Sequence, residues 1–363
     1  MSGAQNQALP RWSVAVPPIA LAVLLGTFGR TWGPILIFDA FVLVAAVLAA
    51  VHHAEVVALR VGEPFGTLIL AIAVTVIEVG LILMLMTSPK GAPTVARDTV
   101  FSAFMIVCNG VVGLGLLIGG LKHRVVEFRV EGVTAALATL TAVAALALVF
   151  PTFTTSTPGA TYSGAQLAFA GLASLALYGV FVFVQAVRHR DYFLPPAPSP
   201  NDAEEEHATP PSNRTALISL GLLLMCLVGV VGLAKTETPA IEKAVATLGA
   251  PEAAVGVLIA LLVLLPETGA AVRAAGRNRV QTSLNLAYGS ALASIGLTIP
   301  AVALASIWVG GPLTLGLDPK ELVLLALTVV VSILTVAPGR ATLMQGSVHL
   351  AIFGAFLFLT FTA

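Results

Sequence analysis

The stretch Gly66-Thr-Leu-Ile-Leu-Ala-Ile-Ala-Val-Thr-Val-Ile-Glu78-Val-Gly-Leu-Ile-Leu-Met-Leu-Met-Thr87 has the length and composition of a membrane-spanning helix. Its 22 residues extend about 33 Å as an α-helix, which is enough to cross roughly 30 Å of hydrocarbon. Its one charged residue, Glu78, lies near the middle. An acidic side chain there costs about 3 kcal/mol on insertion scales, so it indicates a functional site.

The composition of the chain is that of an integral membrane protein. Of its 363 residues, 58% are hydrophobic and 10% are charged, and the mean hydropathy is +0.98. Soluble globular domains are far more polar than this. Lys plus Arg and Asp plus Glu both number 18, so no basic surplus is available to attract nucleic acid. We expect a lipid bilayer as the surroundings, no nucleic-acid partner and no cofactor.

Eleven apolar segments are long enough to cross the membrane as helices. Their approximate bounds are 12–29, 33–52, 66–87, 99–120, 132–150, 165–187, 214–233, 253–273, 281–308, 319–337 and 342–362. Helices are favoured over a barrel because the apolar runs are continuous, and because a helix satisfies its backbone hydrogen bonds within one segment. The sequence therefore predicts an all-α polytopic membrane protein with about 11 transmembrane helices.

A polar stretch divides these segments. It contains the Pro-rich run from Leu194 to Pro200 and four acidic residues between 202 and 206. The predicted organisation is a leading transmembrane helix over 1–30, a first five-helix repeat over 31–187, an acidic and Pro-rich cytoplasmic linker over 188–213, and a second five-helix repeat over 214–363. Five helices per repeat, an odd number, invert the second repeat relative to the first.

The distribution of basic residues predicts the orientation. With the N-terminus inside, 12 of the 18 Lys and Arg residues fall on the cytoplasmic side and six fall outside. Cytoplasmic loops are enriched in Lys and Arg. We therefore expect a cytoplasmic N-terminus.

An internal repeat relates the two halves. A shift of 189 residues places Glu78 on Glu267 and Glu63 on Glu252. Acidic residues are scarce in this chain, so two acidic matches at one shift carry more weight than aliphatic ones. Glu63 and Glu252 stand at the starts of their helices, where an acid interacts favourably with the helix dipole. The alternative for these two is a gate or a cation-attracting vestibule.

Further oxygen atoms accompany the two central glutamates. Thr75 shares a helix face with Glu78, and Ser290 and Ser294 share a face of the segment 281–308. After the glutamates the shift becomes 181, which sets Asn109 on Ser290. These polar groups either support a bound cation or serve close helix packing, for which hydroxyls are common.

The chemistry of these groups favours a hard cation. Carboxylate, hydroxyl and carbonyl oxygens suit Ca²⁺ or Na⁺, and no cluster of histidines or paired thiolates offers a site to a softer metal. A carboxylate in a site of low dielectric constant also tends to hold a proton. Glu78 and Glu267 are therefore candidates to bind a transported metal cation and protons in turn.

Two stretches carry a resemblance to a known family. They are Arg60-Val-Gly-Glu-Pro-Phe-Gly-Thr-Leu-Ile-Leu-Ala-Ile-Ala-Val-Thr-Val-Ile-Glu78, and Leu264-Leu-Pro-Glu-Thr-Gly269 followed by Arg277-Asn-Arg-Val-Gln-Thr-Ser-Leu-Asn-Leu-Ala-Tyr-Gly-Ser-Ala-Leu-Ala-Ser-Ile-Gly296. They resemble the two alpha-repeats of the calcium/cation antiporter superfamily, and within it the bacterial calcium/proton antiporter branch of the cation exchangers. The resemblance extends over nearly the whole chain.

The resemblance implies an antiporter of the cell inner (plasma) membrane that exports Ca²⁺, and in this branch often Na⁺ or K⁺, in exchange for H⁺ by alternating access. By that similarity Glu78 and Glu267 are the principal cation ligands and proton carriers. Many eukaryotic members carry a Gly-Asn pair one turn before each glutamate, whereas this chain has apolar residues and Thr75 there. A Na⁺(K⁺)/H⁺ antiporter on the same fold is the alternative.

Other classes of function are disfavoured. A membrane-embedded hydrolase is less favoured because no His-Glu-x-x-His motif or nucleophile elbow occurs in the sequence. An ATP-driven pump lacks its Walker A pattern. A passive cation channel would need a wetted pore without proton coupling. His349, within the last segment, is either a packing residue, which is favoured, or a proton relay. We do not expect an enzyme.

Overall fold

The computed structural model describes residues 9–27, 33–62, 65–87, 93–196, 210–247, 249, 251, 253–309 and 313–362. Within these ranges ten helices are long and apolar enough to cross a membrane, and α1 (Arg11–Thr27) is a shorter apolar helix. Each predicted apolar segment corresponds to a helix. The prediction of an all-α membrane protein with about eleven helices is confirmed.

The helices form two compact units. Unit 1 comprises residues 1–84 and 197–244, and unit 2 comprises residues 85–196 and 245–363. Each unit therefore contains helices from both sides of the linker. The two units are defined by packing, whereas the predicted repeats over 31–187 and 214–363 are defined by symmetry within the sequence. The repeats therefore stay a prediction.

Unit 1 is built from α1, α2 (Gly33–Val61), α3 (Phe65–Met86) and α10 (Asn213–Thr247). Glycines allow close approach of its helices: Gly232 of α10 packs against Leu24 of α1, and Gly80 of α3 packs against Val231 of α10. Small residues let membrane helices approach in this way.

Two helices of unit 1 are longer than their apolar runs. The run that starts α2 was predicted to end at 52, and the run that starts α10 at 233, but the helices continue to Val61 and Thr247. The added residues include six Ala, three Glu and two Lys, which favour helix whether or not they are apolar. Hydropathy therefore located both helices and underestimated their lengths.

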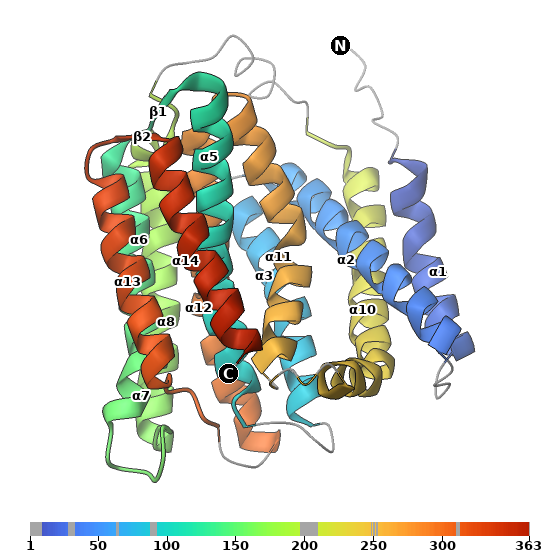
Figure 1. Ribbon diagram of the computed structural model, residues 1–363. Coiled ribbons are helices and arrows are strands. Elements are labelled where there is room, and N and C mark those ends of the chain that lie inside the picture. The colour runs from blue at the N-terminus through green and yellow to red at the C-terminus, as the bar shows by residue number, and fades with distance from the viewer. Residues whose placement is uncertain are drawn as a thin grey trace, which may run out of the picture. The chain divides into compact units, whose positions relative to one another are not determined.

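Unit 2 contains the remaining elements. They are α4 (Val95–Met105), η1 (Ile106–Val111), α5 (Val112–His123), β1 (Val125–Glu127), α6 (Val130–Ala144), η2 (Ala145–Val149), α7 (Phe150–Phe153), α8 (Gly164–Phe183), η3 (Val184–Arg188), η4 (Arg190–Phe193), α11 (Ala253–Gly276), α12 (Val280–Val309), α13 (Pro319–Val336), β2 (Arg340–Thr342) and α14 (Leu343–Phe361). The segments η1, η2 and η3 are π-helical turns within longer helices. Figure 1 shows α5, α6, α8, α12, α13 and α14 running alongside one another.

Close helix packing in unit 2 depends on glycines. Gly346 of α14 lies against the backbone of α5 at Leu117, and Gly256 of α11 lies against the backbone of α4 between Asp98 and Thr99. A β-carbon at either position would meet main-chain atoms, which cannot move aside as a flexible side chain can. Both glycines are therefore required by the approach of the helices.

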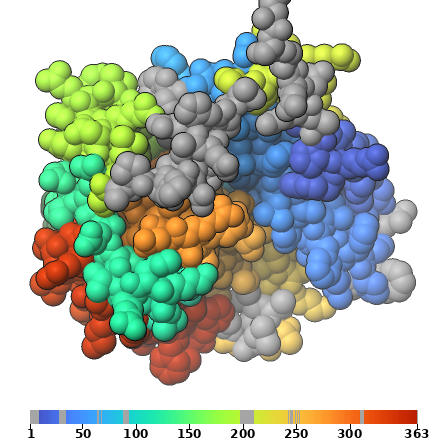
Figure 2. Space-filling model, turned by 90° about the horizontal axis from the view of Figure 1, so that it is seen from above, coloured from blue at the N-terminus to red at the C-terminus, as the bar shows by residue number. Residues whose placement is uncertain are grey.

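A short antiparallel sheet connects two helices at one end of unit 2. Val125 of β1 pairs with Thr342 of β2, so the end of α5 is joined to the start of α14. The backbone N–H of Arg129 donates to Gln281 Oε1 at 2.6 Å, which attaches α12 to the same end. Figure 2 shows this end from above, where the segments around α5, α11 and α12 lie close together. Strands of three residues are too short to be recognised from a hydrophobic pattern.

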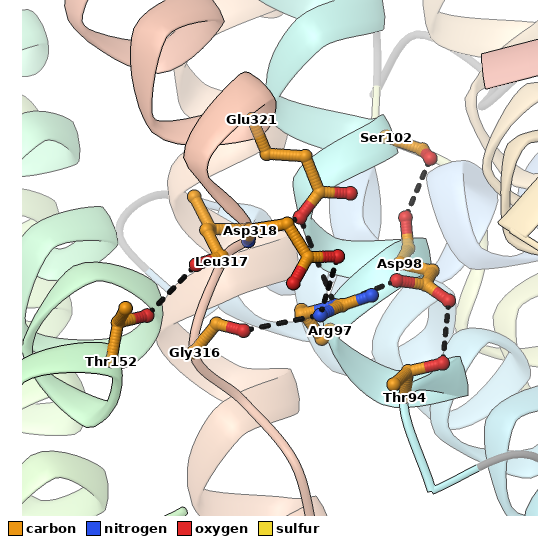
Figure 3. A network of polar contacts seen from close by, with 9 residues as sticks. All are labelled: Thr94, Arg97, Asp98, Ser102, Thr152, Gly316, Leu317, Asp318 and Glu321. Atoms are coloured by element: carbon orange, nitrogen blue, oxygen red, sulfur yellow. Dashed lines mark hydrogen bonds and ion pairs between the residues drawn. The ribbon is translucent and has the colours of Figure 1, made fainter. Parts of the chain in front are cut away.

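A buried ion-pair network connects α4 to the start of α13 (Figure 3). Arg97 Nε lies 2.8 Å from Asp98 Oδ1 and 3.9 Å from Glu321 Oε2, and Arg97 Nη1 lies 3.3 Å from Asp318 Oδ2. Thr94 Oγ1 donates to Asp98 Oδ2 at 2.8 Å. Arg97, Asp98 and Glu321 are all buried. One guanidinium thus compensates carboxylates from two separate stretches of the chain.

Replacing Arg97 by alanine should destabilise unit 2. The change leaves the carboxylates of Asp98 and Glu321 buried without their cation, which costs about 3 kcal/mol or more for a buried pair. The measurement is the thermal unfolding midpoint of the detergent-solubilised protein. Arg340→Ala, at an exposed arginine, is the matched control; an Arg97→Ala midpoint equal to that of the control would contradict the assignment.

Candidate functional site

Glu78 is buried in unit 1. It lies in the second half of α3, with 2% of its surface exposed. Thr75, one turn earlier, is 7% exposed, and its hydroxyl has no hydrogen-bond partner among the described residues. A buried hydroxyl is normally hydrogen-bonded. Thr75 therefore retains an oxygen available as a ligand on the turn that precedes the carboxylate.

Glu267 lies in unit 2, on α11, and its side chain is more exposed than that of Glu78. Pro266 directly precedes it inside the helix, and because proline has no N–H, the carbonyl of Leu262 lacks its usual helical donor. The small residues earlier on the same face, Gly256 and Ala260, are buried. This face of α11 thus packs closely near its start and carries the glutamate two turns further along.

Asn109 belongs to a buried hydrogen-bond network in unit 2. Its Nδ2 donates to Thr328 Oγ1 of α13 at 2.8 Å, and its Oδ1 lies 3.1 Å from His349 Nδ1 of α14. Thr335 Oγ1 lies 3.1 Å from the other ring nitrogen of His349. With Nδ1 donating to Asn109 and Nε2 accepting from Thr335, His349 is a neutral imidazole with both nitrogens satisfied.

This network assigns a structural role to the polar groups that form it. The Nδ2 atom of Asn109 is hydrogen-bonded to α13 and its Oδ1 atom to α14, so its side chain points toward those helices. The packing role favoured for His349 agrees with its two partners. Asn109 also lies in the π-helical turn η1, and such turns occur frequently at functional sites. The use of Asn109 as a supporting cation ligand stays a prediction.

The serines predicted as supporting ligands lie on α12 in unit 2. Ser294 is 4% exposed and Ser290 is partly exposed. The segment η1, which carries Asn109, packs against both α11 and α12. Within unit 2, the structure therefore brings together the helices that carry Glu267, Asn109 and the two serines. Glu63 and Glu252 lie outside the described residues.

The described residues offer no group of three or more His, Cys, Asp and Glu side chains that would hold a metal ion. The thiols of Cys108 and Cys226 are buried and unpaired with each other. Any cation bound by this part of the chain must therefore rely on one or two carboxylates completed by hydroxyl, carbonyl or water oxygens. Ca²⁺ and alkali cations accept such mixed oxygen ligands.

Several polar residues of both units were not singled out from the sequence. Thr328 and Thr335 lie seven residues, or about two turns, apart on α13, and isolated threonines in an apolar helix give no distinctive pattern. Asp39 of α2 is an acidic residue within an apolar segment, as Glu78 is. The criterion that identified Glu78 could therefore have identified Asp39. Glu237 lies beyond the apolar segment of α10, so this criterion could not have identified it.

Comparison with known proteins identifies relatives over nearly the full length of the chain. The family model described as sodium/calcium exchanger protein matches residues 33–187 and 218–362. A Sinorhizobium fredii protein named as an ionic transporter, y4hA, is 46% identical over 357 residues, which cover 97% of this chain and 96% of that protein. The sodium-potassium/proton antiporter ChaA of Escherichia coli is 35% identical, with 99% and 100% covered. The Ca²⁺/H⁺ antiporter of Aphanothece halophytica is 26% identical, with 89% of each chain covered.

Solved structures share the fold. The structure of native YfkE superposes with a TM-score of 0.73 at 17% identity and covers 97% of this chain and 99% of that chain. The H⁺/Ca²⁺ exchanger CAX gives a TM-score of 0.69, also at 17% identity, with 95% and 87% covered. At such low identity these likenesses concern the fold.

Removing the Thr328 hydroxyl should destabilise the protein through Asn109. Thr328→Val preserves the shape of the side chain but leaves the buried Nδ2 group without its acceptor, which costs about 1–3 kcal/mol. Thr139→Val is the control, because the hydroxyl of Thr139 also bonds to a carbonyl one turn earlier and serves no other side chain. The thermal unfolding midpoint should fall for Thr328→Val only; equal midpoints would show that the network contributes nothing.

Proposed function

The chain belongs to the sodium/calcium exchanger protein family, and we propose that it is a secondary antiporter that exports Ca²⁺ in exchange for H⁺ by alternating access. The family consists of cation transporters and not of catalytic enzymes, and ten helices of the described part are long and apolar enough to make the protein multi-pass. The relatives support antiport of a cation, and the family is found in the bacterial plasma membrane. The choice of Ca²⁺ and of the residues that bind it are our proposals.

The observation that supports the proposal is a carboxylate in the interior of an apolar helix on each side of the linker. Glu78 is buried in α3, and Glu267 follows a proline in α11. We propose that the two glutamates bind the metal cation or protons in turn. Each carboxylate offers a negative charge to a metal cation, and it can be neutralised by a proton when the cation leaves. Exchange then follows without any covalent chemistry.

Other residues have supporting roles in this proposal. Thr75, Asn109, Ser290 and Ser294 supply further oxygen ligands or hold the helices that carry the glutamates. Glu63 and Glu252 form a gate or a vestibule that attracts cations. The N-terminus is cytoplasmic, as the distribution of basic residues indicates.

A second candidate is exchange of Na⁺ or K⁺ for H⁺ on the same fold. It is favoured by the 35% identity to the sodium-potassium/proton antiporter of Escherichia coli, over 99% of this chain. The residues one turn before the glutamates are also mainly apolar, which leaves fewer oxygen ligands than the 6 to 8 that Ca²⁺ commonly takes.

Neutralising either glutamate should abolish exchange. In inverted membrane vesicles that carry a respiratory pH gradient, added Ca²⁺ should collapse the gradient through the wild-type protein, as reported by a pH-sensitive dye. Glu78→Gln and Glu267→Gln keep the size of the side chain but remove the charge that binds Ca²⁺, so both should reduce the response to that of vesicles without the protein.

The control for this experiment is Glu131→Gln, which removes an exposed acid at the start of α6 and should leave exchange unchanged. Adding Na⁺ or K⁺ in place of Ca²⁺ decides between the two candidate functions. Full exchange of every tested cation by both well-folded glutamate variants would rule out the proposed mechanism.

Removing the hydroxyl of Thr75 should weaken cation binding without abolishing transport. Thr75→Val is nearly isosteric and leaves the carboxylate of Glu78 in place. We expect the cation concentration that gives half-maximal exchange to rise a few-fold while the maximal rate is largely kept, because one neutral ligand is lost. A half-maximal concentration unchanged from wild type would show that Thr75 is not a ligand.

A further inference from the structure

Unit 1 contains a second pair of buried carboxylates that the proposed exchange site does not include. Asp39 of α2 has 0% of its surface exposed, and Glu237 of α10 has 4%. Neither oxygen of Asp39 has a hydrogen-bond partner among the described residues, and the same holds for Oε1 of Glu237. Buried carboxylates are usually hydrogen-bonded or paired with a cation. Both oxygens of Asp39 and the Oε1 atom of Glu237 depart from this rule.

The two residues lie toward the same end of their helices in unit 1. At the other end of the helices, Arg60 Nε of α2 donates to Asn213 Oδ1 of α10 at 2.6 Å. From this contact, Asp39 lies 21 residues back along α2 and Glu237 lies 24 residues along α10, or about 32 Å and 36 Å at 1.5 Å per residue. Figure 1 shows α2 and α10 running in opposite directions. The two carboxylates are close enough to interact electrostatically.

The backbone adds a further oxygen on the α10 side. Pro239 lies within α10, two residues after Glu237, and it has no N–H to donate to the carbonyl of Lys235. Figure 1 shows the last turns of α10 leaving the axis of the preceding turns, as expected at a proline. The turn that carries Glu237 therefore also carries a carbonyl that lacks its helical donor.

We propose that Asp39 and Glu237 form a cation-binding site in unit 1 that takes a hard metal cation such as Ca²⁺ or Na⁺. Two ionised carboxylates without a partner repel each other in a medium of low dielectric constant, and a metal cation between them removes that repulsion. Carboxylate and carbonyl oxygens are the ligands that such cations prefer. The lysine nearest in sequence, Lys235, is exposed and forms no ion pair with either carboxylate.

The site shares helix α10 with a contact made by α3, the helix that carries Glu78. Gly80 of α3 packs against Val231 of α10, and Glu237 is six residues further along α10, or about 9 Å along its axis. We propose that a cation bound by Asp39 and Glu237 is staged there, about 9 Å along α10 from the place where α3 packs against that helix. This staging role rests on the proposed antiport, whereas binding at the site does not.

The test uses the purified full chain in lipid nanodiscs, in a background that carries Glu78→Gln and Glu267→Gln so that the proposed exchange site is neutral. Equilibrium dialysis with radioactive Ca²⁺ and, separately, Na⁺ measures what remains bound. We expect this background to keep saturable binding of at least one of the two ions. Adding Asp39→Asn or Glu237→Gln should weaken that binding at least about tenfold, and adding Glu237→Asp, which keeps a carboxylate, should weaken it less.

The matched control is Glu55→Gln, which removes an exposed acid from the same helix α2 and should leave binding unchanged. Thermal unfolding gives a second measure: Ca²⁺ or Na⁺ should raise the unfolding midpoint of the background protein but not that of the Asp39→Asn variant. Because Asp39→Asn removes an uncompensated charge, the variant should fold without the cation.

Two results would overturn the site. One is a background protein that binds neither ion. The other is binding that persists unchanged in Asp39→Asn and Glu237→Gln, in which case the two carboxyl groups share a proton and hold no metal. Both are distinct from failure of the proposed function, which is tested by exchange in the single variants of Glu78 and Glu267.

Discussion

An ionised side chain inside an apolar helix costs several kcal/mol unless another group compensates it, and this constraint governs where the charges of both units lie. The chain is 58% hydrophobic, and the side chains of a few charged residues within its helices, such as Asp39, Glu78 and Arg97, are buried. Each must therefore be matched by a neighbouring helix, by a proton or by a bound cation. The manner of compensation distinguishes charges that hold the fold from charges that are available for transport.

Unit 2 compensates its buried charges internally. Arg97 meets Asp98 of its own helix and the acids at the start of α13, and Asn109 and His349 satisfy each other together with two threonines. These contacts fix α4, α13 and α14 relative to one another. The polar atoms in these contacts already have partners, so their residues stabilise the packing around the helix that carries Glu267.

Unit 1 contains buried carboxylate oxygens that the described part of the protein does not compensate. Asp39 and the Oε1 atom of Glu237 are buried without hydrogen-bond partners among the described residues, and the hydroxyl of Thr75 beside Glu78 is likewise without one. Carboxylates in this condition are unstable when ionised and are stabilised by a cation or a proton, and a free hydroxyl can add a neutral ligand. A transporter needs such groups, because a ligand that is fully satisfied by protein has no reason to bind cargo. The proposed sites of unit 1 rest on these groups.

Much of the fold could be predicted because hydropathy acts locally. The apolar run around Glu78 must be a helix in a membrane whatever its neighbours are, since only a helix satisfies the backbone of a single segment. The lengths of α2 and α10 were underestimated, because residues beyond the apolar run continue a helix by their intrinsic preference. The strands β1 and β2 were missed, because strands of three residues gain their stability from pairing with a distant segment. Val126 pairs with Ala341, which lies 215 positions later in the sequence.

The sequence by itself determined that this is a helical membrane protein with an acid in the interior of an apolar helix on each side of a polar linker. These properties depend on each segment's own composition. Only the tertiary structure decided which polar groups are compensated. Asn109 is engaged by Thr328 and His349, and Asp39 lies toward the same end of unit 1 as Glu237, because helices distant in sequence pack at particular positions along their lengths. No local pattern contains that information, since the energy of a buried polar group depends on the partner that packing brings to it.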